Sequence, residues 1–123
     1  MLQSLLYVGI GGFIGSVARI LCQQYAQRFI PIDFPTGTMV VNLIGSFAIG
    51  LIYGLAEQRT FLTPVAKLFL TAGLCGGFTT FSSFTYESFN LLRSGQISMA
   101  LIYIVVSNVT GLAAVVGGYY AVK

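Results

Sequence analysis

Apolar residues fill four long stretches of the chain, and polar or helix-breaking residues separate them. The stretches cover roughly residues 2–27, 34–56, 65–91 and 96–121. Each exceeds the ~20 residues that a helix needs to cross the hydrocarbon core of a bilayer. The connections carry charges and breakers: Pro31, Asp33 and Pro35, then Glu57, Arg59 and Pro64, then Arg93, Ser94 and Gly95. The pattern predicts an all-α membrane protein whose single domain, residues 1–123, has four transmembrane helices.

The third apolar stretch is interrupted by glycines, hydroxyls and aromatic residues. From Gly73 to Phe84 the chain reads GLCGGFTTFSSF, where a membrane helix normally carries aliphatic side chains. Backbone polar groups in lipid must be satisfied within the protein, so an interruption at this depth survives only when it is buried or faces a polar cavity. We therefore expect a break in the third helix, and the break indicates an ion site.

Composition agrees with a membrane location and excludes other classes. The 123 residues are 56% hydrophobic and only 7% charged, with a mean hydropathy of +0.88, which is too little charge for an ordinary soluble surface. The first stretch lacks a basic start and a cleavage site, so we expect a retained helix rather than a signal peptide. The net charge of +3 comes from scattered residues, so nucleic-acid binding has no support. Cys22 and Cys75 lie in apolar surroundings, where we expect small hydrophobes rather than a disulfide or metal pair.

Basic residues are balanced between the two ends of the predicted bundle. Three fall at one end and two or three at the other: Arg59, Lys67 and Lys123 against Arg28, Arg93 and, at the border, Arg19. The positive-inside rule therefore scarcely selects an orientation. This balance predicts a chain that inserts both ways and pairs as an antiparallel dual-topology homodimer. A single orientation, fixed by one or two charges or by the insertion machinery, remains the alternative.

Glycines four residues apart recur along the predicted helices. The pairs are Gly11/Gly15, Gly50/Gly54 and Gly73/Gly77. This spacing puts small residues on one helix face and lets two backbones approach closely. We expect tight helix packing, either within one subunit or between subunits.

The polar residues at membrane depth are nearly all neutral hydrogen-bonding groups. The sequence has no His, and the first two predicted helices have no acid before Glu57, whereas a proton-coupled transporter needs a titratable group in the membrane. Hydroxyl and amide hydrogens can replace part of the hydration shell of a small anion and still release it, which a fixed positive charge would hinder. This set of neutral polar residues therefore favours an anion pathway.

Four of these residues pair by helical spacing. Phe81 and Phe84 are three residues apart, and their positive ring edges suit an anion, although core packing is the commoner use of such a pair. Tyr103 and Ser107 are four apart and would form a polar track along the last helix. The alternative for the track is hydroxyls bonded to their own helix.

Three further polar residues stand apart from these pairs. Asn42 carries an amide that needs a partner in lipid, so it binds a neighbouring helix or points into a pore. Arg19 borders a charge-free stretch, and we favour a structural or vestibule role for it. Glu87 fits a water-filled mouth and a simple interfacial position equally well.

Three motifs together resemble the Fluc (CrcB) fluoride-channel family over the whole chain. They read Gly11-Gly12 with Gly15 and Arg19, then Pro35-x-Gly37-Thr38-x-x-Val41-Asn42-x-x-Gly45, then Gly73-x-x-Gly76-Gly77-x-Thr79-Thr80-Phe81-Ser82-x-Phe84. The resemblance implies a passive fluoride-selective channel, not an enzyme, in the lipid of a bacterial inner membrane. It also implies an antiparallel dual-topology homodimer with two pores.

The resemblance implies roles for individual residues as well. The fluoride pore would be lined by Asn42, Phe81, Phe84, Tyr103, Ser107, Thr80 and Ser82. Vestibules would be lined by Arg19 and Glu87. A structural sodium ion at the dimer interface would be held by the backbone carbonyls of Gly76 and Thr79, since carbonyls freed by a helix break suit a hard cation.

One part of the chain departs from the family pattern. Gly111 and Val115 continue the Tyr103/Ser107 spacing where some family members carry hydroxyls. The far end of the polar track is therefore in doubt.

Two other functions remain open from the residues alone. A four-helix drug or cation antiporter has a similar length and dual topology, but it needs an intramembrane acid, for which only Glu87 qualifies. A structural membrane subunit would carry no ion at all.

Overall fold

All regular structure in the part of the chain that the computed structural model describes, residues 1–30, 34–58 and 62–122, is helical. Four segments are long and apolar enough to cross a membrane: Leu2–Phe29, Thr36–Glu57, Pro64–Arg93 and Ile97–Ala121. The predicted all-helical architecture with four spans is therefore confirmed, with bounds within a few residues of those expected.

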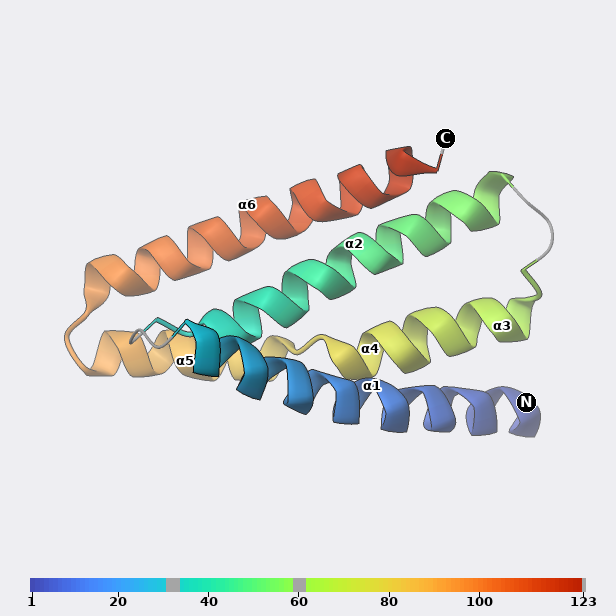
Figure 1. The fold of residues 1–123 in the computed structure, drawn as a ribbon, viewed down its shortest axis with the longest axis horizontal. Coiled ribbons are helices and arrows are strands. Elements are labelled where there is room, and N and C mark those ends of the chain that lie inside the picture. Colours follow the sequence, from blue (N-terminus) through green and yellow to red (C-terminus); the bar gives the residue numbers. More distant parts are fainter. Residues whose placement is uncertain (31–33, 59–61, 123) are drawn as a thin grey trace.

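Three of the spans are continuous helices and the third is composite. The continuous ones are α1 (Leu2–Phe29), α2 (Thr36–Gln58) and α6 (Ile97–Ala121). The composite span runs through α3 (Pro64–Leu68), a π-helical segment η1 (Phe69–Cys75), α4 (Gly76–Phe78) and α5 (Phe81–Arg93). Figure 1 shows these pieces as one row, with a short non-helical stretch between α4 and α5.

Threonine side chains cap the N-terminal ends of the first and last helices of the composite span. The Thr63 hydroxyl accepts a hydrogen bond from the Ala66 N–H at 3.1 Å, and Pro64 follows in the first helical turn, where its missing N–H costs nothing. Thr79 and Thr80 are extended, with φ/ψ of −90°/162° and −151°/121°. The Thr80 hydroxyl accepts from the Ser83 N–H at 3.3 Å, so Thr80 begins α5 as its cap.

Glycines let the helices of one subunit approach closely. α1 packs against η1 and α4, and α2 packs along α6. A Cβ added at Gly11 would lie 2.8 Å from the Phe69 carbonyl oxygen, and one added at Gly77 would lie 2.6 Å from that of Gly12. A Cβ at Gly54 would lie 2.6 Å from the Tyr119 carbonyl oxygen. All three glycine pairs thus serve packing within the subunit.

The start of α1 and the end of α6 lie at the same end of the bundle, together with the end of α2 and the start of α3 (Figure 1). Arg28, in the last turn of α1, and Arg93, in the last turn of α5, lie at the opposite end. Arg59 and Lys123, which the charge balance also counted, fall outside the described residues. The even number of spans accounts for this arrangement.

Candidate functional site

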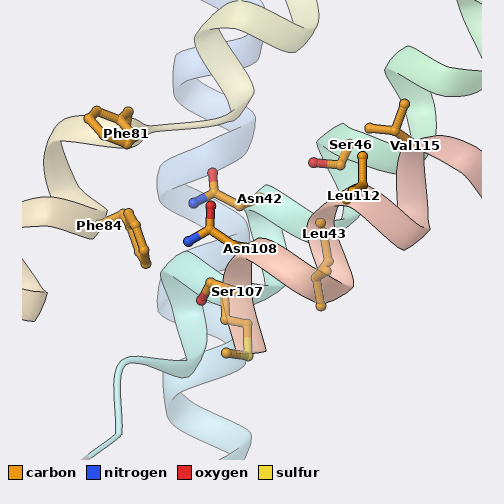
Figure 2. A pocket seen from close by; sticks show the side chains of 11 residues that line it. Asn42, Leu43, Ser46, Phe81, Phe84, Ser107, Asn108, Leu112 and Val115 are labelled. Carbon is orange, nitrogen blue, oxygen red and sulfur yellow. The ribbon is translucent and has the colours of Figure 1, made fainter. Parts of the chain in front are cut away.

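A cavity of about 350 Å³ lies between α2, α5 and α6 (Figure 2). It brings together Asn42, Phe81, Phe84 and Ser107, which are four of the residues that the sequence predicted for a pore. The other lining residues are Met39, Leu43, Ser46, Asn108, Gly111, Leu112 and Val115. None of the lining residues is charged, so polarity comes only from hydroxyl and amide groups.

A second cavity of about 300 Å³ adjoins the first, since Asn42, Ser46, Phe81 and Phe84 line both. The ring centroids of Phe81 and Phe84 are 6.0 Å apart, and their planes are inclined by 49°. The second cavity adds the residues around the extended segment, among them Thr71, Cys75, Gly76, Thr79 and Thr80. The two aromatic rings therefore stand where the two spaces meet.

Asn42 on α2 holds the extended segment by a pair of hydrogen bonds. Its Nδ2 donates to the Thr80 carbonyl oxygen at 3.1 Å, and its Oδ1 accepts from the Thr80 N–H at 2.8 Å. A side-chain amide can pair in this way with one extended residue, because that residue's N–H and C=O both point to one side. The partner that the sequence expected for this amide is thus the extended segment before α5, and the half-buried amide also lines the cavity.

The backbone carbonyls of Gly76 and Thr79 lose the donors that a continuous helix would supply. Those donors are the N–H groups four residues later, at Thr80 and Ser83. The Thr80 N–H donates to Asn42 and the Ser83 N–H donates to the Thr80 hydroxyl instead. Gly76 is exposed on the surface of the single chain. These carbonyls are therefore suitable ligands for a hard cation.

Arg19 on α1 reaches the same region of backbone. Its Nε donates to the Gly77 carbonyl oxygen at 3.1 Å, and the side chain is half-buried. This bond satisfies one of the carbonyls at the end of α4 and places a positive charge beside that helix end. The guanidinium keeps further N–H groups beyond the Nε that this bond uses.

Glu87 on α5 accepts hydrogen bonds from two hydroxyl groups. The Thr38 hydroxyl donates to one carboxylate oxygen at 2.9 Å, and the Tyr103 hydroxyl donates to the other at 3.1 Å. Gln23 on α1 donates in turn to the Thr38 oxygen at 3.3 Å. Glu87 also lines a third cavity, of about 530 Å³, where α1 ends, α2 begins and α5 joins α6.

Tyr103 and Ser107, predicted to form one polar track, face different surroundings. Tyr103 is fully buried, packs its ring 5.1 Å from that of Phe84, and lines neither of the first two cavities. The Ser107 hydroxyl is buried at the first cavity and has no hydrogen-bond partner among the described residues. Ser107 is thus the available hydroxyl, whereas that of Tyr103 is committed to Glu87.

Ser82 lies outside both cavities, although the sequence grouped it with the pore residues. It is exposed in the first turn of α5, and its hydroxyl lies 3.5 Å from that of Thr80. Thr80 lines the second cavity. In the described residues no group of three or more His, Cys, Asp or Glu side chains could hold a metal.

Sequence reasoning did not single out Thr38 and Asn108. Thr38 is almost completely buried, with 2% of its surface exposed, and it joins Gln23 to Glu87. It precedes Asn42 by one helical turn within the second motif, which could have identified it. Asn108 lines the first cavity and follows Ser107 directly.

Comparison with known proteins places the chain among channel sequences. The profile of the family described as CrcB-like protein, Camphor Resistance (CrcB), matches residues 6–119. A protein of Chlorobaculum tepidum named fluoride-specific ion channel FluC is 46% identical over 123 residues, which cover 100% of this chain and 97% of that protein. A protein of the same name from Leptospira interrogans is 40% identical over 121 residues, covering 98% and 95%. Another from Chlorobium luteolum is 45% identical over 122 residues, covering 98% and 92%.

Proposed function

Because the chain belongs to the CrcB-like family, whose named relatives are ion channels and not enzymes, we propose that it is a passive, fluoride-selective channel. The chain is a multi-pass membrane protein by its four spans, and the proposal places it in a bacterial inner membrane. It would let fluoride leave the cell down its electrochemical gradient.

The uncharged cavity with unused hydrogen-bond donors is the observation that carries this proposal. Among the described residues the Ser107 hydroxyl has no partner, and Asn42 uses only one of its two amide hydrogens on Thr80. Such donors can replace water around a small anion, and without a fixed charge the anion is also released. Fluoride is the strongest hydrogen-bond acceptor among the halides, so it gains most from these donors.

The positions of Phe81 and Phe84 support a role for them in the same pathway. Both rings line both cavities, so an ion that passes from one space to the other meets them. An aromatic ring has a positive edge, which can face an anion that has lost part of its water. Aliphatic side chains of similar size would close the passage without offering this contact.

Vestibule roles for Arg19 and Glu87 are part of the proposal. Glu87 lines the cavity at the end of the bundle, and two hydroxyl donors hold its charge. These two charge-assisted hydrogen bonds fix the position of the carboxylate in the lining of that cavity. Arg19, with N–H groups beyond the one bonded to Gly77, would raise the local concentration of anions.

We also propose the antiparallel dual-topology homodimer with two pores. Polar residues such as Ser82, Thr85 and Asn108 are exposed on the single chain, and Phe81 is 77% exposed. Hydroxyls and amides at membrane depth are costly against lipid, so a second copy that covers them is favoured. The balanced basic residues favour a copy of opposite orientation.

A structural sodium ion at the dimer interface completes the proposal. The carbonyls of Gly76 and Thr79 have lost their helical donors, and Gly76 is exposed. Two carbonyl ligands from one chain do not enclose a hard cation, which binds several oxygen ligands at once. A second copy would double the number, and the bound ion would hold the two extended segments together.

Aromatic substitutions test the pore assignment. We expect Phe81→Ile and Phe84→Ile to lower the rate of fluoride efflux from liposomes at least about tenfold. Each substitution removes a positive ring edge, and the loss of one good anion contact accounts for a change of that size. Phe13→Ile is the matched control, since Phe13 is an exposed α1 residue outside both cavities. Unaltered efflux from both pore variants would remove the two rings from the pathway.

A further inference from the structure

Asn108 on α6 is a polar residue in a costly position to which no role has yet been given. It is exposed on a membrane-spanning helix of the single chain. Its amide lines the first cavity, and it also lines a further space beside α5, with Phe81, Phe84 and Thr85. An amide against hydrocarbon is expensive unless its hydrogen-bonding groups find partners, so a polar species beside Asn108 would be stabilising.

One hydrogen bond determines the orientation of this amide. Nδ2 of Asn108 donates to the Ile104 carbonyl oxygen, one turn back, at 2.7 Å. The nitrogen therefore lies on that side and the oxygen on the other, an assignment that follows from the partner. Figure 2 shows the amide nitrogens of Asn42 and Asn108 turned to the side of Phe84, and the Ser107 hydroxyl nearby.

The three groups that keep a free hydrogen line one cavity. Asn42 and Asn108 each use one amide hydrogen in the described residues, which leaves one on each. The Ser107 hydroxyl hydrogen is unused as well. Two helices thus present three hydrogen-bond donors beside the rings of Phe81 and Phe84. A group of donors without a fixed charge suits a small anion and not a cation.

We propose that Asn108 is a further anion-binding residue of the pathway, where its free amide hydrogen completes a site with Ser107 and Asn42. The inference rests on the proposed function, since it names a ligand contact for the same ion. Asn108 sets how tightly the anion is held in the first cavity, and with it the preference for fluoride over larger anions that accept hydrogen bonds more weakly.

Substitutions at Asn108 test the proposal. The quantity measured for each variant is the half-saturating concentration, the fluoride concentration that gives half-maximal flux through the protein in liposomes. Asn108→Leu keeps the branching at Cγ and removes the donor, and we expect the half-saturating fluoride concentration to rise about tenfold, the worth of one hydrogen bond to a charged group. Asn108→Asp should raise it further, because an ionised carboxylate only accepts hydrogen bonds and repels the anion.

Thr110→Val is the matched control. The Thr110 hydroxyl also donates to its own helix, to Val106 at 2.6 Å, but Thr110 lines neither the first cavity nor the space beside α5. We expect its half-saturating concentration to equal that of the unaltered protein. The thermal stability of every variant in detergent is measured as well, because a loss of packing at Asn108 would lower it.

The outcomes distinguish a failure of this inference from a failure of the proposed channel function on which it rests. An unchanged half-saturating concentration in Asn108→Leu and Asn108→Asp, while Phe81→Ile is inactive, would overturn the role of Asn108 and leave the channel intact. An unaltered protein that releases no fluoride would overturn both. A graded rise from the unaltered protein through Leu to Asp, with Thr110→Val unchanged, supports the proposal.

Discussion

Asn42 is the residue on which the geometry of the candidate pathway most depends. Its amide accepts a hydrogen bond from the Thr80 N–H at 2.8 Å and donates one to the Thr80 C=O at 3.1 Å. These bonds replace the helical bonds that the extended backbone lacks. The same side chain lines both cavities. Structure and ligand contact are thus combined in one amide, so its removal affects stability and flux together.

Substitution of Asn42 should therefore lower both quantities. Asn42→Leu leaves two backbone groups of Thr80 without their partner, and each buried unsatisfied group costs about 1–3 kcal/mol. We expect a clearly lower unfolding temperature in detergent and at least a tenfold loss of fluoride efflux from liposomes. Ser46 lines the same cavities without a bond to Thr80, so Ser46→Ala is the control for stability. A stable Asn42→Leu protein would contradict the structural part of this account.

At the residue scale, helical spacing predicted which residues share a face but not which partner each would find. Tyr103 and Ser107 were grouped by their spacing, yet the Tyr103 hydroxyl bonds to Glu87 while that of Ser107 stays unpaired at the cavity. Thr38 and Glu87 are 49 positions apart, and their meeting depends on how three helices pack. Such contacts are decided by tertiary packing, which no local pattern encodes.

At the scale of elements, the composite third span differs most from an ordinary membrane helix. The stretch of glycines and hydroxyls pointed to this region, and the structure has extended backbone at Thr79 and Thr80. The π-helical segment η1 before it was not anticipated. Periodicity could not have revealed it, because a π-helical turn differs from an α-helical one by a single residue within a uniformly apolar stretch.

Close packing of α1 on this span predicts the effect of single glycine substitutions. A Cβ at Gly15 would overlap the Leu74 backbone carbonyl, whereas a Cβ at Gly9 would have nothing within 4 Å. We expect Gly15→Ala to destabilise the protein by about 1–3 kcal/mol through overpacking. Gly9→Ala should be neutral or slightly stabilising, since Ala is the better helix former. Thermal unfolding in detergent compares the two, and equal unfolding temperatures would refute the close approach.

At the scale of the whole molecule, the four spans could be predicted because their length and hydropathy are local properties of the sequence. The assembly could not be predicted in the same way. Balanced basic residues and exposed polar groups on α5 and α6 favour a second copy of opposite orientation. The relation between copies depends on surfaces that only the folded chain brings together.

Labelling of a single cysteine tests the dual topology. In a background with Cys22 and Cys75 changed to alanine, Gln96→Cys puts an exposed thiol at the start of α6. We expect an impermeant thiol reagent added outside cells to label about half of the protein, and the rest only after permeabilisation, because oppositely oriented copies are equal in number. Labelling that is complete from one side, or absent from it, would establish a single orientation.

The passive release of fluoride from liposomes that contain the unaltered protein, beside chloride-loaded liposomes, tests the central claim most directly. The account predicts rapid loss of fluoride, little loss of chloride, and no need for a proton gradient, since no titratable side chain of the described residues lines the first cavity. Fluoride loss that requires a proton gradient would point to coupled exchange, for which Glu87 is the available acid. No flux of either ion from folded protein would contradict the channel itself.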